Sequence, residues 1–230
     1  MAAGDKKTVV MKVCGKVPDA EGNVSPTAAD VRAAPGGFGL GERGKQLTSA
    51  DDVNNIWKCG WYKFVSGNVP QNAIILSYLN LLRVESAANS AFMQTIYGMA
   101  DNASYQITPS AQRCIYGSKI TPWEYINPPM ILGVEYRTTE RYKGKPVYAQ
   151  LVPFGPLPNN TLAATAHGIA NFGDCIEFTI NTVNGKGGPM NGDLNVVGCW
   201  ANETQMNIKT TEDYSSSTAN VLLRYTKTTD

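Results

Sequence analysis

The chain contains a single histidine, His167, so any mechanism that needs an imidazole base must use it. It lies between Ala166 and Gly168, in a stretch typical of a strand edge or a turn, and no G-x-S-x-G motif accompanies it. We therefore expect a structural histidine whose ring bonds to the backbone, and we expect no cofactor. The alternative is a metal held by the copies of His167 on the axis of a symmetric trimer.

Pairs of carboxylates are the other route to catalysis, because glycoside hydrolysis uses two of them. Four pairs are close in sequence, and they are Asp51/Asp52, Glu135/Glu140, Asp174/Glu177 and Glu212/Asp213. Adjacent acidic residues on turns usually cap the local backbone. The chain also lacks the long repeats of a β-helical depolymerase. We therefore expect no enzyme, and a glycan-degrading enzyme is the alternative.

Aromatic and amide side chains near the C-terminus could bind a carbohydrate instead. A sugar stacks its apolar face on an aromatic ring and bonds its hydroxyl groups to amides and hydroxyls. The candidates are Trp200, Asn202, Tyr214, Ser216 and Asn191. Tyr214 lies in a polar loop and is expected to be exposed, whereas Trp200 ends an apolar run and is expected in the core or at a sheet end. Trp57, Trp61 and Trp123 are expected to pack in a core or between domains.

The charge pattern excludes several kinds of partner. There are 20 basic and 19 acidic side chains, a net charge of +1, and no basic stripe that would neutralise phosphates, so no nucleic-acid partner is expected. No apolar run reaches the roughly 18 residues of a membrane span, so no membrane insertion is expected. The N-terminus lacks the apolar region of a secretory signal, which predicts synthesis in the cytoplasm.

Five cysteines, Cys14, Cys59, Cys114, Cys175 and Cys199, are spread widely without a C-x-x-C pair. This spacing predicts reduced and mostly buried thiols, with Cys14 nearest the surface.

The composition favours short strands joined by turns. Charged residues make up only 17% of the chain, whereas it contains 22 Gly and 13 Pro. Strands are predicted over Gly60–Val65, Phe92–Tyr97, Arg113–Tyr116, Cys175–Val183, Asn195–Ala201, Gln205–Thr211 and Ala219–Thr226, and over two runs around Lys143–Pro146. The even spacing in residues 131–230 predicts an antiparallel sandwich or barrel.

Residues 47–130 are predicted to form a small β domain with a short helix. Ser49–Ile56 is typical of a capped helical start, and Trp123–Ile126 closes the domain before Asn127. Ala73–Val84 is long and apolar, which indicates a buried strand, although its pattern also allows a helix.

Residues 1–46 are predicted to be a shaft-like connector. Val9–Val13 can form a strand, Pro18–Asn23 a turn and Thr27–Val31 a capped helical turn, and Pro35–Gln46 is a Gly-rich linker. So short a segment cannot bury its own apolar face. We therefore expect partner chains to supply the missing core, as in a homotrimer.

Three ordered motifs resemble bacteriophage and prophage tail-fibre proteins. Val13–Val24 followed by Thr27–Val31 is similar to a fibre-shaft connector, with Cys14 where Asn is usual. The Asp52–Asn55, Gly60–Tyr62, Gln94–Tyr97 and Pro122–Ile126 stretches resemble the pyocin-knob family. Pro128–Tyr148, Ala166–Ile169 and Leu223–Thr228 resemble the C-terminal fibre-tip domain of prophage tail proteins. The resemblance implies a homotrimeric virion component, exposed extracellularly, that assembles with other tail or baseplate proteins.

These patterns lead to one main hypothesis and one non-enzymatic alternative. The main hypothesis is a tail-fibre receptor-binding protein that attaches to a bacterial surface polysaccharide. The alternative is a structural tail spacer or adaptor without a ligand of its own.

Overall fold

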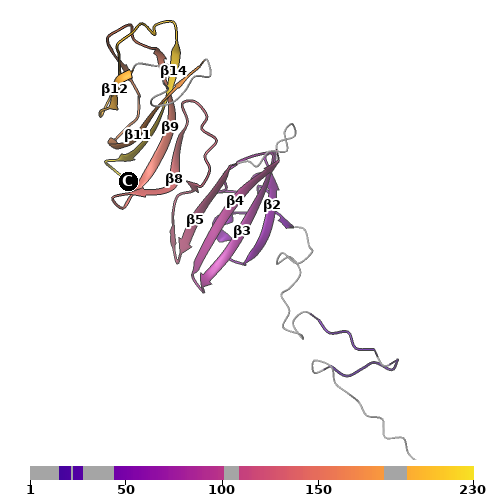
Figure 1. Cartoon of the computed structure of the whole chain (residues 1–230). Helices are drawn as coiled ribbons and strands as arrows, with labels where there is room; N and C mark the ends of the chain where they lie inside the picture. Colours follow the sequence, from indigo (N-terminus) through magenta and orange to yellow (C-terminus); the bar gives the residue numbers. More distant parts are fainter. Residues whose placement is uncertain (1–15, 22, 28–43, 101–108, 184–195) are drawn as a thin grey trace, which may run out of the picture.

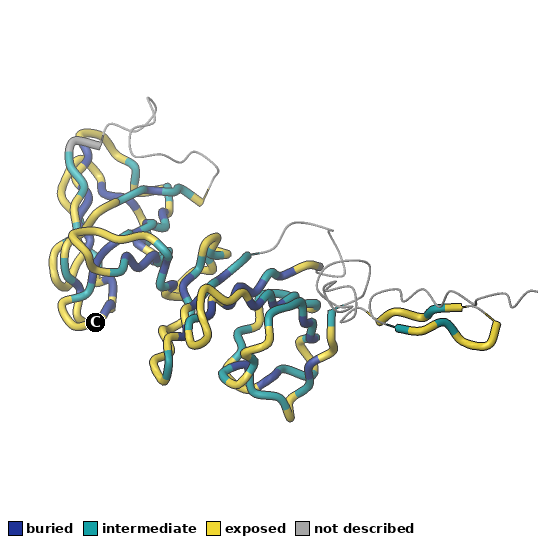
Figure 2. The backbone as a smooth tube through the Cα atoms, turned by 90° about the horizontal axis from the view of Figure 1, so that it is seen from below, coloured by how far each residue is buried: buried dark blue, intermediate teal, exposed yellow. Residues whose placement is uncertain are grey.

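The computed structural model describes residues 16–21, 23–27, 44–100, 109–183 and 196–230 (Figure 1). Within these residues the chain is mainly β, as the sequence predicts, and the one helical element is the 3₁₀ turn η1 (Val53–Asn55). The buried residues fall into two separate clusters, one between Leu47 and Ile115 and the other between Tyr148 and Tyr225 (Figure 2).

The first β unit contains strands β1 to β7. They are β1 (Lys45–Gln46), β2 (Gly60–Val65), β3 (Leu79–Ala88), β4 (Ala91–Ala100), β5 (Ser110–Tyr116), β6 (Lys119–Ile120) and β7 (Glu124–Tyr125). Strands β2 to β5 form an antiparallel meander, with β1 parallel to β2 at one edge and β7 antiparallel to β5 at the other. The alternation of large apolar and polar residues buries one face of this sheet. That face carries Phe64, Leu82, Val84, Ile96 and Ile115.

The loop between β1 and β2 covers the buried face of this sheet. Leu47 and Val53 reach the core from this loop and are almost fully buried. Asp52 caps η1 by accepting a hydrogen bond from the Asn54 N–H at 2.9 Å. The buried Gln94 fixes η1 on the sheet, because its Nε2 donates to the Val53 carbonyl at 2.7 Å. The helical start predicted at Ser49–Ile56 is thus a single turn capped by Asp52.

The apolar stretch Ala73–Val84 is only partly a strand. Strand β3 begins at Leu79, and residues 73–78 run as an irregular loop over the core. The side chain of Asn80 accepts from the Leu76 and Ser77 N–H groups and donates to the Ser77 carbonyl. These bonds hold a tight turn before the strand, so a polar residue inside the apolar run sets where β3 starts.

The second β unit contains strands β8 to β14. They are β8 (Glu135–Tyr142), β9 (Lys145–Pro156), β10 (Leu162–Ala166), β11 (Phe172–Thr182), β12 (Val196–Ala201), β13 (Gln205–Thr210) and β14 (Thr218–Lys227). Strands β8, β9, β14 and β11 form one antiparallel sheet, and β10, β13 and β12 form another. Strand β10 was not predicted, because its Ala-rich sequence has one β-branched residue, Thr165, and no aromatic residue.

The two sheets of the second unit share one core, which is the sandwich arrangement that the sequence predicts. Met206 and Ile208 of β13 pack in one cluster with Ile180, Val221 and Leu223 of the larger sheet. Burial and a hydrogen bond to Glu135 raise the pKa of Tyr225, whose phenol group donates to that carboxylate. The C-terminal strand is therefore central to the sandwich.

The two units meet at β7 and β8. Their strands pair at one position, Tyr125 with Thr138, and the rings of Tyr125 and Tyr136 meet edge to face at 4.9 Å. Glu124 accepts from Arg137 at 3.0 Å and from Arg141 at 2.7 and 2.8 Å. A buried carboxylate shared by two arginines therefore joins the units.

Residues 1–46, which the sequence predicts to be a connector, are only partly described by the structure. None of the described residues 16–21 and 23–27 is buried (Figure 2). The predicted Val9–Val13 strand lies outside the described residues, as do most of the Thr27–Val31 helical turn and Cys14. Gln46 and Lys45, assigned to the connector, pair with β2, and the domain boundaries at 46/47 and 130/131 stay predictions.

The expectation that most cysteines are buried is wrong for the four that the structure describes. All four are free thiols, but Cys114 and Cys175 are exposed, and Cys59 and Cys199 are half-buried. The first two lie on strands whose outward positions face solvent.

Among the described residues, no helix is long and apolar enough to cross a membrane, and no three metal-binding side chains gather at one point.

Candidate carbohydrate-binding sites

Trp200 is the one C-terminal candidate that presents an aromatic face. It lies next to the end of the edge strand β12 and is 44% exposed, so of the two expected positions the sheet end is right and the core is wrong. Its ring lies 3.4 Å from where a Cβ on Gly198 would stand, which is ordinary van der Waals contact. Opposite it on β13, Asn207 is 6% exposed, and its buried Nδ2 has no hydrogen-bond partner in the described part of the chain.

Asn202 has a structural role in the hairpin between β12 and β13. Its Oδ1 accepts from the N–H groups of Thr204 at 3.0 Å and Gln205 at 2.8 Å, which closes the turn. Its backbone carbonyl accepts a bond from His167. Only the amide nitrogen of this side chain remains to contact a ligand.

Tyr214 and Ser216 lie apart from Trp200. Tyr214 is half-buried and packs against the core, contrary to the expectation of an exposed loop residue, and its N–H donates to the Pro158 carbonyl at 3.1 Å. Both residues follow the end of β13 at Thr210, whereas Trp200 pairs with Asn207 nearer its start. The predicted site is therefore split between the two ends of the small sheet. Asn191 lies outside the described residues.

His167 is buried at 5% exposure, and both of its ring nitrogens are used. Nδ1 accepts from the Ile169 N–H at 3.0 Å, so Nε2 carries the proton and donates to the Asn202 carbonyl at 3.1 Å. The ring also lies against Phe172 at 4.6 Å between centroids. A metal on a trimer axis would have to break these two bonds first.

The carboxylate pairs are engaged in holding local structure. Glu135 accepts from Tyr225 and from Lys227, and Glu140 pairs with Arg224 at 2.5 Å. In the third pair, Asp174 forms an ion pair with Lys143 and Glu177 forms one with Arg224. In the fourth pair, Glu212 accepts a hydrogen bond from the Tyr214 hydroxyl and Asp213 accepts one from the Ser215 hydroxyl. Such contacts are the capping and hairpin roles that the sequence favours for them.

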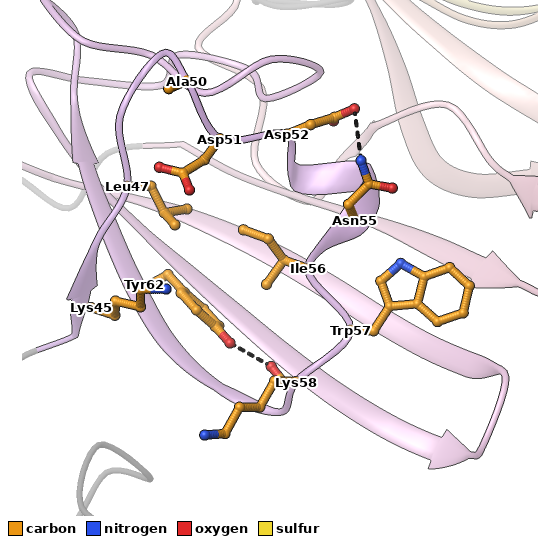
Figure 3. A pocket seen from close by; sticks show the side chains of 10 residues that line it. All are labelled: Lys45, Leu47, Ala50, Asp51, Asp52, Asn55, Ile56, Trp57, Lys58 and Tyr62. Atoms are coloured by element: carbon orange, nitrogen blue, oxygen red, sulfur yellow. Dashed lines mark hydrogen bonds between the residues drawn. The ribbon is translucent and has the colours of Figure 1, made fainter.

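A groove on the first β unit joins an aromatic ring with several polar groups (Figure 3). It has a volume of ≈ 460 Å³ and is formed by β1, the loop with η1, and the start of β2. We call it the Trp57 groove; it is lined by Lys45, Leu47, Ala50, Asp51, Asp52, Asn55, Ile56, Trp57, Lys58 and Tyr62. A groove of this size can hold one or two sugar rings.

Trp57 is 45% exposed, so the expectation that it packs in a core or between domains is wrong. Its Nε1 donates to the Asn54 carbonyl at 2.9 Å, and its ring contacts Phe92 at 5.6 Å between centroids. The indole is thus fixed in one orientation with much of its surface open. A preorganised aromatic face loses little entropy when a ligand stacks on it.

Polar groups at the other end of the groove are held by hydrogen bonds of the loop. Asp51 accepts from the N–H and the hydroxyl of Thr48 at 2.8 and 3.0 Å, and these bonds lower the pKa of its carboxyl group. Tyr62 donates its hydroxyl to the Lys58 carbonyl at 2.7 Å (Figure 3), and burial raises the pKa of its phenol group. The walls of the groove are therefore set before a ligand arrives.

The other two tryptophans of the first unit are half-buried. Trp123 donates to the Asn72 carbonyl at 2.9 Å and lies under the guanidinium of Arg113 at 4.4 Å. Burial lowers the pKa of Arg113 to about 10, and its Nη2 is buried without a partner among the described residues. Trp61 contacts Tyr97 at 6.2 Å on the opposite face of the sheet. Trp123 thus packs against the core, as expected, whereas Trp61 packs outside the core, against Tyr97 and Arg83.

The sequence around Trp57 contains a signal for an exposed aromatic residue. Trp57 follows a turn rich in Asp and Asn and precedes Lys58, and an aromatic residue between polar neighbours is often exposed. The pairing of β1 with β2, which closes the groove, could not be predicted from sequence, because it joins Lys45 to Tyr62 across 17 residues of chain.

No protein-family model matches the chain, and no curated protein matches it. Among solved structures, three pyocin tail fibres are similar over most of the chain. An N-truncated R2-type fibre is 12% identical with a TM-score of 0.29 and covers 84% of this chain and 100% of its own. A P. aeruginosa R2 fibre is 11% identical with a TM-score of 0.30, and the match covers 84% of this chain and 69% of that one. A P. aeruginosa R1 fibre is 13% identical with a TM-score of 0.31, and the match covers 82% of this chain and 68% of that one. TM-scores this low do not establish a common fold.

Proposed function

We propose that this chain is a tail-fibre-type adhesion protein that binds a polysaccharide of the bacterial surface. The observation that carries the proposal is the Trp57 groove, where a fixed, open indole lies beside carboxylate, amide and ammonium groups. This combination matches the amphipathic surface of a sugar ring. Trp200, which is the exposed aromatic residue of the small sheet, is kept as a second contact.

The ordered motifs in the sequence support the tail assignment. The Asp52–Asn55 and Gly60–Tyr62 stretches, which resemble the pyocin-knob family, contribute Asp52, Asn55 and Tyr62 to the lining of the groove. The proposal places the protein in the virion as a homotrimer that assembles with other tail or baseplate proteins. A trimer would present three grooves together, and multivalency raises weak affinities by roughly 10²–10⁴.

The proposal favours binding over hydrolysis. The paired carboxylates of the second unit already accept hydrogen bonds or ion pairs, and Asp51 and Asp52 hold the loop of the groove. A general acid needs a proton at neutral pH, whereas the pKa of Asp51 is lowered. A glycan-degrading enzyme would release reducing sugar from the polysaccharide that it binds.

The test is binding of the full chain to polysaccharide purified from the envelope of a susceptible bacterium. Trp57→Ala removes the stacking surface and is expected to weaken binding roughly tenfold, measured by isothermal titration calorimetry. Trp57→Phe keeps an aromatic ring against Phe92 and is expected to retain most of the affinity.

The matched control is Trp123→Phe, which changes a half-buried tryptophan of the same unit outside the groove. It is expected to leave the affinity unchanged. Equal binding by Trp57→Ala and the unmodified chain would contradict the assignment of the site. Absence of binding to any envelope polysaccharide would favour the spacer or adaptor alternative.

A further inference from the structure

The acidic side chains of the Trp57 groove are occupied by contacts within the protein. Asp51 accepts two bonds from Thr48, and Asp52 accepts from the Asn54 N–H at 2.9 Å and from the Asn72 amide at 2.8 Å. These bonds join the loop, the cap of η1 and the segment before β3. These bonds fall on Oδ2 of Asp51 and Oδ1 of Asp52, so a cationic ligand would share each carboxylate with the contacts that hold the loop.

The basic side chains of the same groove are free to bind. Lys45 and Lys58 are both exposed, and neither ammonium group makes a hydrogen bond or an ion pair with the described residues. Lys45 acts on Asp51 only through the longer-range Coulomb attraction that helps to lower the pKa of that carboxyl. Each ammonium group therefore offers three unused donors to a ligand.

The carboxylates of the groove already accept hydrogen bonds, whereas its ammonium groups have no partner among the described residues. We therefore infer that the Trp57 groove selects acidic saccharides, with hexuronate residues as the ligand class. The inference rests on the proposed function, because it specifies which glycan the groove takes. An anion gains charge-assisted hydrogen bonds from Lys45 and Lys58 without breaking a bond of the loop. A cation would meet carboxylates whose charge is already partly offset by the hydrogen bonds of the loop, although the formal charges of the lining cancel.

The shape of a uronate fits the arrangement of the groove. Its carboxylate is attached directly to the ring, so it projects from the ring edge while the apolar ring face remains free to stack. Lys58 follows Trp57 directly in the chain, and Lys45 lies next to Tyr62 at the other wall (Figure 3). Stacking on Trp57 and ion pairing with a lysine can therefore occur in one bound orientation.

The test compares tetragalacturonate with its fully methyl-esterified form, which keeps the rings and removes the charges. The full chain is expected to bind the acid at least about fivefold more tightly than the ester in low salt, by isothermal titration calorimetry. This preference is expected to shrink as salt rises from about 20 to 300 mM, because the contacts are exposed and screened.

Variants assign the preference to the groove. Lys45→Gln with Lys58→Gln is expected to remove the preference for the acid, and Trp57→Ala is expected to weaken binding of both ligands. Lys119→Gln, with Lys119 exposed on β6 outside the groove, is the control.

Three results would overturn the inference: equal affinity for acid and ester, binding of neither, or a preference that survives the double lysine variant. With equal affinity, loss of both ligands in Trp57→Ala would leave the proposed function standing. If neither ligand binds, the proposed function is decided separately by the envelope-polysaccharide titration.

Discussion

Asp51 links the chemistry of one residue to the shape of the groove. Its carboxylate accepts two bonds from Thr48, one from the backbone and one from the side chain, and so fixes the chain where it passes from β1 to η1. An ionised acceptor makes both bonds stronger than a neutral one would. The protonation state of this one group therefore affects the edge of the proposed binding site.

A pH dependence follows from the lowered pKa of Asp51. A carboxyl whose pKa is lower in the folded than in the unfolded chain stabilises the fold above its unfolded pKa of about 3.9, and this contribution is lost as the pH falls through the folded pKa. Asp51→Ala should therefore be less stable than the unmodified chain at pH 7, and the gap should close below about pH 4. Urea unfolding at pH 7, 5 and 3 measures the gap. A constant gap would show that the ionised carboxylate is not the cause.

At the scale of the elements, the turn between β8 and β9 sets the register of the larger sheet in the sandwich. Lys143 and Gly144 have φ of 50° and 79°, so both residues of this two-residue loop are in the left-handed region. Paired positive φ values are typical of the type I′ turn, whose twist matches that of a hairpin. The Lys-Gly sequence indicates the turn because glycine adopts such angles without cost.

Substitution of Gly144 is expected to destabilise the second unit through the backbone alone. A Cβ at this position meets nothing within 4 Å, so Gly144→Ala has no steric clash, but alanine at this φ costs about 1 kcal/mol. Gly67→Ala is the matched control, because Gly67 also has open space and lacks a positive φ. Thermal unfolding followed by circular dichroism measures both. Equal melting temperatures for the two variants would contradict the turn assignment.

The strands were largely predictable, whereas the contacts that shape the site were not. Gly60–Val65 matches β2 because alternating large side chains have one structural solution on a half-buried sheet. The loop at residues 73–78 was missed because Asn80 forms its turn through side-chain bonds that the apolar pattern conceals. Exposure of Trp57 depends on the path of the loop over Phe92, which is set by tertiary packing.

At the scale of the whole molecule, Glu124 connects the two β units. Its side chain is 11% exposed and accepts from Arg137 and Arg141, and Arg137 also pairs with Asp230 at the C-terminus at 2.5 Å. The junction thus draws charged groups from β7, β8 and the end of the chain. Removal of the one carboxylate leaves two arginines close together without their shared partner.

Loss of this carboxylate is expected to destabilise the chain. Glu124→Gln should lower the free energy of unfolding by about 2 kcal/mol, less than the roughly 3–5 kcal/mol of a fully buried pair because Arg141 is partly exposed. Glu85→Gln is the control, since its pair with Arg83 is exposed on both sides and should contribute less than about 1 kcal/mol. Urea unfolding measures both variants, and a Glu124→Gln effect no larger than that of the control would refute the role of the junction.

The central claim is that the first β unit holds a glycan on Trp57, and attachment to whole bacteria tests it most directly. Fluorescently labelled full-length chain is incubated with susceptible cells, and bound fluorescence is measured by flow cytometry for the unmodified chain, Trp57→Ala and Trp200→Ala. The proposal predicts that Trp57→Ala loses most of the binding, that Trp200→Ala loses less, and that soluble envelope polysaccharide displaces the unmodified chain. Undiminished attachment by Trp57→Ala, with its fold intact by circular dichroism, would contradict the claim.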